Sequence, residues 1–193
     1  LALAERKGLD VLLLCKCGFG TMKEAQHLLK EDDSLLAEIN KLLSSQGLEY
    51  RGNVQAKHLL TVLHEEISVP EIKKHISTAF SGLKIATHYG CHALRPSKIT
   101  GFDDPVSPHV FDDLVKATGA KSVDWASKLE CCGAPLFGIN DTLSMKLTGR
   151  KLEDAKEAKA DFLCTACPYC QLHFDSVQAM MVSRNGGAPP VGS

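Results

Sequence analysis

Five cysteines occupy three widely separated places in this chain, and the fold must account for all three. Cys91 stands alone, Cys131 and Cys132 are adjacent, and Cys167 and Cys170 bracket a Cys-Pro-Tyr-Cys motif. Thirty-nine residues separate Cys91 from the adjacent pair, and thirty-four separate the pair from Cys167. Cys91 and Cys167 each follow a short apolar run that predicts a strand. Because ligands gather beyond the carboxyl ends of parallel strands, one shared sheet would place these thiols in a single site.

Apolar runs and helical spacings alternate along the sequence, which predicts an α/β fold with a mainly parallel sheet flanked by helices, of Rossmann-like type. The expected strands are residues 10–15, which we interpret as buried, 54–57, 82–88, 121–124 and 160–164. The expected helices are residues 2–7, 21–29, 34–43, 58–65, 70–79, 109–118, 140–159 and 168–181. Further local expectations are a turn at residues 18–20, an N-cap at Ser34, a break at Gly149, a core position for Trp125 and a tail at residues 186–190.

A faint internal repeat suggests two modules. Residues 4–10, followed by an apolar run and Cys15, resemble residues 155–161, followed by an apolar run and further cysteines. We therefore expect residues 1–80 to be the end of a first module with a helical connection, and residues 81–193 to be a second module. The chain begins at Leu1 inside an expected helix, so we interpret it as part of a longer polypeptide.

Composition excludes several classes of function. The net charge is −1, which gives no electrostatic basis for binding nucleic acid or an acidic membrane. No apolar run reaches the roughly 18 residues that a membrane-spanning helix needs, so we expect no membrane insertion. No secretory leader is visible, and we expect a cytoplasmic protein. Eight cysteines in such a protein indicate metal or redox chemistry rather than structural disulfides.

The cysteine pattern favours a metal centre with more than four thiolates. Consecutive side chains diverge in extended backbone, so Cys131 and Cys132 would reach two different iron atoms more easily than one. Gly133 can adopt a positive φ and let the loop fold against an inorganic cluster. Pro168 suits the first position of a helix, which places Cys167 at a helix N-terminus that favours a thiolate. Four of these thiolates could also hold zinc, which stays an alternative.

At these residues the sequence resembles a known family. The pattern Cys-x39-Cys-Cys-Gly-x33-Cys-Pro-x-Cys, together with the stretch from His88 to Pro96, is similar to the cysteine-rich CCG domain of the heterodisulfide reductase subunit designated B. The resemblance implies that one module binds a non-cubane 4Fe-4S cluster through five cysteines. The ligands it implies are Cys91, Cys131, Cys132, Cys167 and Cys170.

The resemblance also implies an activity and partners. It implies an iron–sulfur oxidoreductase subunit that reductively cleaves a small disulfide of the coenzyme M–coenzyme B type. It further implies other heterodisulfide reductase-like subunits as electron donors. The family continues past Pro190 with another strand and helix, so the second module is expected to be C-terminally truncated. The first module of the family ends in Cys-x-x-Cys, where this sequence has Cys15-Lys-Cys17-Gly18, so a first cluster is not expected from this chain alone.

Other residues near the motifs leave alternatives open. His92 is the candidate proton donor to a leaving thiolate, and His88 is interpreted as a hydrogen-bonded histidine at the end of the sheet. Cys164 is expected to be a core thiol, while Cys15 and Cys17 are expected to lack partners. Residues 151–159 are expected to form a solvated helix face, and Arg95 to lie at the surface. The competing functions are a zinc-bound structural module, a CCG domain that only relays electrons, and a glutaredoxin-like thiol–disulfide oxidoreductase built on the Cys167–Cys170 motif.

Overall fold

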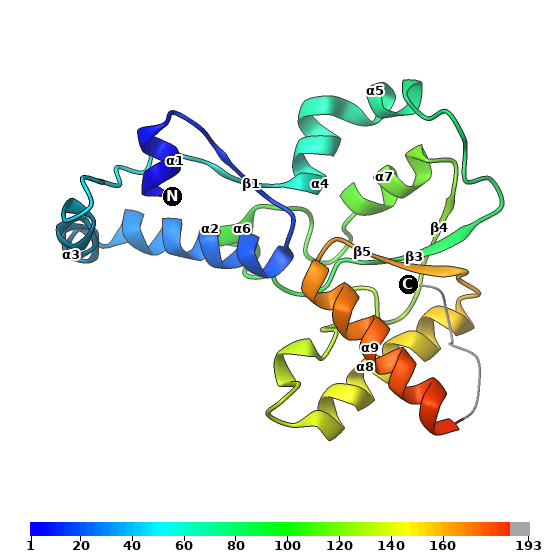
Figure 1. The fold of residues 1–193 in the computed structure, drawn as a ribbon. Coiled ribbons are helices and arrows are strands. Elements are labelled where there is room, and N and C mark those ends of the chain that lie inside the picture. Colours follow the sequence, from blue (N-terminus) through cyan, green and yellow to red (C-terminus); the bar gives the residue numbers. More distant parts are fainter. Residues whose placement is uncertain (186–193) are drawn as a thin grey trace.

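The protein is described by a computed structural model of residues 1–185, so the expected tail at residues 186–190 lies outside the described part. Two parallel sheets organise the chain (Figure 1). The smaller sheet pairs β1 (Val11–Leu13) with β2 (Ala56–His58). The larger sheet has the order β4–β3–β5, formed by β4 (Lys121–Val123), β3 (Lys84–His88) and β5 (Phe162–Thr165). All its strands are parallel, which confirms the α/β prediction.

Helices cover both faces of the larger sheet. On one face lie α7 (Val110–Ala117) and a helical segment made of α4 (Leu59–Thr61), the π-helical η1 (Val62–Ser68) and α5 (Val69–Lys74). On the other face lie α8 (Asp141–Glu157) and α9 (Pro168–Asn185) (Figure 1). Each face has its own apolar cluster, one around Phe111 and Leu114 and the other around Leu163 and Phe174. The order is therefore helix, sheet, helix, the arrangement in which a parallel sheet buries both faces.

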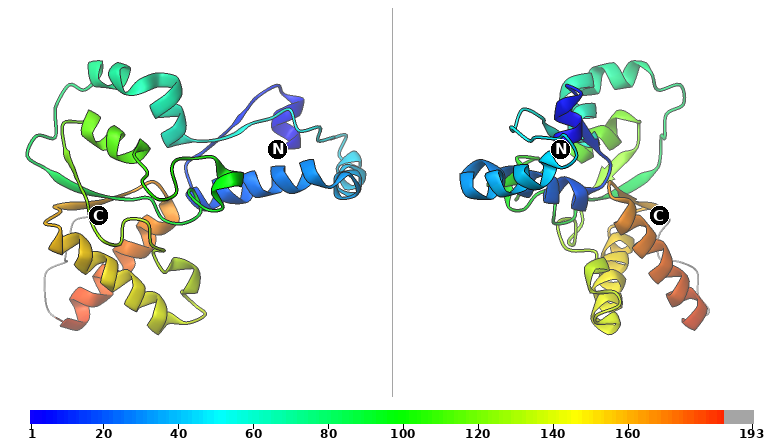
Figure 2. Two further views of the ribbon diagram at one scale, coloured as in Figure 1. Left: turned by 180° about the vertical axis from the view of Figure 1, so that it is seen from behind. Right: turned by 60° about the vertical axis from the view of Figure 1, so that its left-hand side comes forward.

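The N-terminal part extends away from this layered body (Figure 2). It contains α1 (Ala2–Arg6), the small sheet, α2 (Lys16–Glu31) and α3 (Asp33–Ser44). One end of α2 packs near the larger sheet and beside α6 (Ser97–Thr100), and the other end meets α3. A third apolar cluster around Tyr50 and Val54 holds this part together. Through α2, the N-terminal part reaches the cysteine-bearing end of the sheet.

Several local predictions are wrong, each for a physical reason. Residues 18–20 form no turn, because α2 begins at Lys16 and runs through them. Ser34 is not the N-cap of α3; the Asp32 side chain accepts the Leu35 N–H at 2.9 Å instead. Strand β1 is not buried: its central residue Leu12 and the adjoining Leu14 are more than half exposed, since only β2 pairs with it.

Two helical predictions also need correction. The expected gap between residues 65 and 70 is only partly present: π-helical turns continue through Val62–Ser68, and the break before α5 falls at Ser68, which has φ of +76°. Gly149 does not break α8, because the helix is held by fully buried Leu152 and Ala155 in the next turn. A glycine inside a helix costs only about 1 kcal/mol, which that burial outweighs. Trp125 is buried, as predicted.

Candidate metal centre

Three segments bring five thiols to one edge of the larger sheet. Cys91 follows the end of β3, and Cys167 follows the end of the neighbouring parallel strand β5. Cys131 and Cys132 lie in the loop between β4 and the short helix η2 (Ala134–Leu136). Because β3 is the central strand, the chain segments leaving its two neighbours close over Cys91 from both sides. Cys170 comes from the first turn of α9, where the Gln171 N–H donates to the Cys167 carbonyl at 3.0 Å.

The five thiols gather around one small cavity. Cys91, Cys131, Cys132 and Cys170 line it, together with Cys17. The sulfurs of Cys132 and Cys170 lie within 4.8 Å of each other, and the Cys167 sulfur lies within 4.8 Å of that of Cys17. The structure therefore gathers all five sequence-predicted cysteines in one place. No pair of them forms a disulfide.

These thiols cannot all ionise together without a cation. The neighbouring thiols of Cys132 and Cys91 lower the pKa of Cys131, and the neighbouring Cys131 raises the pKa of Cys91. Contacts with Cys132 and Cys167 similarly raise the pKa of Cys170. Neighbouring thiolates repel one another, so each ionised thiol opposes the ionisation of the next. Only some of the five thiols can therefore be ionised at once. A metal reverses this, because it binds thiolates and releases their protons.

Backbone geometry at Gly133 supports the adjacent cysteines. Gly133 has φ of +91°, as expected, and a Cβ there would lie 2.7 Å from the Ser144 carbonyl oxygen. The Gly133 N–H donates to Cys131 Sγ at 3.4 Å, and the Thr148 hydroxyl donates to the Cys132 carbonyl at 2.7 Å. Helix α8 thus fixes the loop that presents both thiols.

Two buried ammonium groups face the thiols. Lys16 Nζ donates to the carbonyls of His88 and Tyr89, at the end of β3. Burial lowers the pKa of Lys16 to about 8, although nearby thiolates, foremost Cys170, act in the opposite direction. Lys151 Nζ donates to the Ser127 carbonyl and to the Glu130 carbonyl at 3.2 Å, and burial lowers its pKa to about 8. The expectation of a solvated face is wrong for Lys151, because its side chain is buried and its amine lies over Trp125 and bonds to the loop that precedes Cys131.

Cys15 and Cys17 have partners at the site, contrary to expectation. Cys15 Sγ lies 3.5 Å from Cys167 Sγ, and Cys17 Sγ lies 3.2 Å from His92 Nδ1. The sulfurs of Cys15, Cys17 and Cys167 all lie within 4.8 Å of one another. Their approach depends on Gly20, where a Cβ would lie 2.7 Å from the His92 carbonyl oxygen. This contact joins two parts of the chain that no local pattern links, so the sequence gives no signal for it.

The two histidines beside Cys91 differ sharply. His92 is exposed, whereas His88 is fully buried and neither of its ring nitrogens has a hydrogen-bond partner among the described residues. The interpretation of His88 as a hydrogen-bonded histidine is therefore wrong. A ring nitrogen of His88 lies within 4.8 Å of the sulfurs of Cys132 and Cys170. Burial lowers the pKa of His88 well below its ordinary value, and the positive charges of Lys16 and Lys151 add to that effect. His88 is thus a neutral imidazole beside the thiols.

The remaining candidates lie outside the thiol group. Cys164 packs into the apolar cluster on the α7 face rather than against the cysteines, and Arg95 is exposed. A cavity of about 20 Å³ opens between the thiols, lined in part by Lys16, His88 and His92. It is small because the thiols lie against one another.

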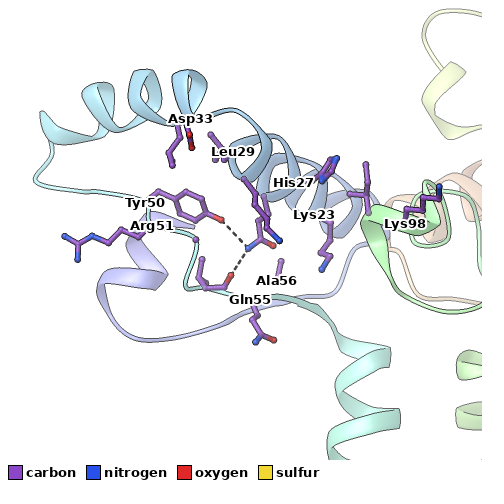
Figure 3. A pocket seen from close by; sticks show the side chains of 15 residues that line it. Lys23, His27, Leu29, Asp33, Tyr50, Arg51, Gln55, Ala56 and Lys98 are labelled. Carbon is purple, nitrogen blue, oxygen red and sulfur yellow. Dashed lines mark hydrogen bonds between the residues drawn. The ribbon is translucent and has the colours of Figure 1, made fainter.

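A much larger groove lies elsewhere, in the N-terminal part (Figure 3). Its volume is about 630 Å³, and it is bounded by α2, α3 and the segment leading to β2. Gln26 crosses it and donates to the Val54 carbonyl at 2.7 Å and to the Tyr50 hydroxyl at 3.4 Å. No cysteine lines this groove. The largest groove and the cysteine site are therefore separate.

Comparisons with known proteins agree with this site. The family model of the cysteine-rich domain CCG matches residues 85–175. The ferredoxin:CoB-CoM heterodisulfide reductase subunit designated B, from Methanosarcina mazei, is 38% identical over 96% of this chain and 62% of its own length. The corresponding heterodisulfide reductase subunit from Methanosarcina acetivorans is 36% identical over the same shares. The 8-methylmenaquinol:fumarate reductase membrane anchor subunit from Wolinella succinogenes is 34% identical over 99% of this chain and 66% of its length.

The fold has a counterpart among solved structures. A crystal structure of a hypothetical protein from Helicobacter pylori superposes with a TM-score of 0.68 at 13% identity, over 94% of this chain and 32% of that one. Among residues 1–185, no helix combines the length and apolarity needed to cross a membrane. The chain spans less than two thirds of the heterodisulfide reductase subunits that it matches. These matches and the thiol geometry together show that residues 85–175 are a cysteine-rich CCG domain, in a chain related to these heterodisulfide reductase subunits.

Proposed function

We propose that this chain is part of an iron–sulfur oxidoreductase subunit and holds a non-cubane 4Fe-4S cluster. The proposed ligands are Cys91, Cys131, Cys132, Cys167 and Cys170. The observation that carries the proposal is the single small cavity that Cys91, Cys131, Cys132 and Cys170 line together with Cys17, whose sulfur lies within 4.8 Å of that of Cys167. Five thiols exceed the four that a tetrahedral zinc site or a cubane cluster uses, which favours a less common iron–sulfur centre.

The surroundings suit an anionic cluster. Lys16 and Lys151 bring two positive charges to the thiols from separate elements, one from α2 and one from α8. The Gly133 N–H already donates to a cysteine sulfur, as hydrogen bonds to cluster sulfurs commonly do. When bound, the cluster would supply electrons and iron atoms with affinity for sulfur. The protein's part is to exclude water, neutralise charge and fix the five thiolates.

We further propose His92 as the residue that protonates a leaving thiolate. Its imidazole is exposed beside Cys91 and contacts Cys17 through Nδ1, so it can exchange protons with solvent and with a bound thiol. Histidine titrates near neutral pH, which suits this role. The substrate class we propose is a small disulfide of the coenzyme M–coenzyme B type. Other heterodisulfide reductase-like subunits would supply the electrons, in the cytoplasm.

The division of the chain fits this proposal. Residues 1–80 would be the end of a first module with its helical connection, and residues 81–193 the second, cluster-bearing module. Cys15 and Cys17 reach the second module's thiols, so the two parts would meet at the cluster. Disulfide cleavage is proposed for the whole enzyme rather than for this chain alone, because the chain spans 62% of the length of its Methanosarcina relatives.

A zinc-bound structural or electron-relay domain is the second candidate. It is favoured by His88, whose ring nitrogen lies near Cys132 and Cys170 in a group that a single metal ion could bridge. In that case one zinc ion would replace the cluster, and no disulfide chemistry would follow.

Elemental analysis of anaerobically prepared protein separates the two. About four iron atoms and matching sulfide per chain would support the cluster, and zinc with thiolate neighbours at about 2.3 Å and no iron would support the structural module. Cys132→Ser should lose iron and change the visible spectrum. Cys164→Ser is the matched control, since this thiol packs into the other apolar cluster, and it should keep both. Full iron content in Cys132→Ser would refute the proposed ligand set.

A further inference from the structure

A second group of metal-type side chains lies away from the cysteines, on the α7 face of the larger sheet. His64 belongs to η1, His109 is the N-cap residue of α7, and Asp113 lies one turn into α7. Figure 1 shows the helical segment between the labels α4 and α5 lying alongside α7. Two histidines and a carboxylate from two separate elements therefore converge on one spot.

The distances fit a single metal ion. Asp113 Oδ2 lies 3.4 Å from His64 Nε2 and 3.0 Å from His109 Nδ1, and all three ligand atoms lie within 4.8 Å of one another. Zinc binds nitrogen and oxygen at about 2.0–2.1 Å in a tetrahedron, which sets its ligand atoms about 3.4 Å apart. The side chains therefore need only small movements to enclose an ion.

A buried carboxylate lies near the second ring nitrogen of His109. Asp103 has a side chain only 3% exposed, and its Oδ1 lies 3.7 Å from His109 Nε2. Its other oxygen accepts the backbone N–H groups of His109 and Val110, each at 2.8 Å, which fixes its position. Metal-binding histidines usually donate their second ring N–H to a carboxylate of this kind. A metal ion would take the place of the hydrogen that His109 Nδ1 now shares with Asp113 Oδ2, and the remaining ring proton would lie on Nε2, on the side of Asp103.

The shape of the site also suits a metal ion with an open position. Lys116 engages the other oxygen of Asp113, Oδ1, at 3.6 Å and leaves Oδ2 to the histidines. A groove of about 360 Å³ opens beside His64 and Asp113, with room for water or an anion. His64 lies in a π-helix, a conformation often found at functional sites.

We propose that His64, His109 and Asp113 bind one divalent transition-metal ion of the zinc class, with Asp103 orienting His109. The ion fastens η1 to α7, and through α7 it fastens the segment that precedes β3 to the larger sheet. Imidazole and carboxylate ligands together suit zinc and its neighbours in the transition series rather than calcium or magnesium. This site is independent of the cysteine centre.

The test is zinc binding by the full chain, prepared anaerobically, with X-ray absorption at the zinc edge. The wild type should bind zinc with a shell of nitrogen and oxygen neighbours at about 2.0–2.1 Å, distinct from thiolate neighbours at about 2.3 Å. His64→Gln and His109→Gln should each lose that shell and one equivalent of zinc, with affinity at least tenfold weaker. Asp103→Asn should weaken binding by about 10–100-fold.

His75→Gln is the matched control. His75 is an exposed histidine that pairs with Glu71 four residues away, the same spacing that separates His109 from Asp113. It should bind zinc like the wild type. Unchanged zinc stoichiometry and affinity in His64→Gln and His109→Gln would overturn the proposal. So would a shell of sulfur alone in the wild type, a result that does not depend on whether any variant folds.

Discussion

Replacing Asp112 with asparagine should destabilise the protein strongly, because this carboxylate joins four parts of the cysteine-bearing half. Asp112 lies in α7 and its side chain is 8% exposed. It accepts hydrogen bonds from Thr87 Oγ1 at 2.8 Å, from the Tyr89 hydroxyl at 3.1 Å and from Ser122. Lys128 Nζ pairs with it at 2.7 Å. Thr87 and Tyr89 lead directly to Cys91, so this network also positions the first thiol.

The expected magnitude follows from removing one partner of a buried ion pair. Such a change typically costs about 3–5 kcal/mol, because the remaining charge stays buried without compensation. Lys128 is 16% exposed and can partly reach water, which places the expected loss near the lower end, at about 3 kcal/mol. One carboxylate oxygen of Asp112 would also be replaced by an amide NH₂ group. That group cannot accept the hydrogen bonds that the hydroxyls now donate to the carboxylate.

Urea unfolding followed by circular dichroism, under anaerobic and reducing conditions, measures this loss. Asp124→Asn is the matched control: its carboxylate lies 4.0 Å from the same Lys128 but is 97% exposed, so its loss should stay below about 0.5 kcal/mol. Adding Lys128→Met to Asp112→Asn should recover part of the stability, since removing both charges avoids an unpaired one. A loss below about 1 kcal/mol for Asp112→Asn would refute the reasoning.

The pH dependence gives an independent check. Burial acts to raise the pKa of Asp112, but Lys128, Ser122 and Thr87 outweigh it, so the folded pKa is lowered. A lowered carboxyl pKa contributes stability that is present above the unfolded value of about 3.9 and is lost as pH falls through the folded value. The stability difference between wild type and Asp112→Asn should therefore be constant from about pH 5 to 7 and shrink below about pH 4.

The other predictions concern the site and its support. Gly133→Ala should destabilise by about 1–3 kcal/mol in urea unfolding and reduce iron content, because φ is +91° and its Cβ would meet the Ser144 carbonyl, whereas Gly47→Ala, with open space around it, should cost less. Phe174→Ala should cost about 3–5 kcal/mol, because Phe174 is fully buried with its ring 5.1 Å from that of His88; a loss under about 1 kcal/mol would contradict this. If the cluster is present, Lys16→Met should make its reduction potential more negative in an anaerobic spectroelectrochemical titration, because a buried positive charge favours the reduced form; an unchanged potential would show that Lys16 acts only on the backbone.

Much of the fold could be predicted from local patterns. The strand before Cys91, the helix that begins at Pro168 and the helix that ends before Gly119 all rest on short-range chemistry: an apolar run, a ring that fixes φ, and a glycine at φ of +88°. The convergence of Cys91 and Cys167 could also be predicted from the sequence. Parallel pairing of β3 with β5 leaves both residues at one edge of the sheet. These features depend on residues close together in sequence or on a general rule of sheet topology.

Other features of the site depend on contacts that no short pattern contains. The thiols of Cys15 and Cys17 reach the site only because Gly20 lets α2 lie against the His92 backbone. Lys16 and Lys151 look like ordinary surface lysines in sequence, yet the fold closes over them and turns their amines toward backbone carbonyls. The sequence alone therefore determined which groups can bind metal and in which elements they lie. Tertiary packing decided which of them meet and which charges surround them, because burial and long-range contact are properties of the folded chain as a whole.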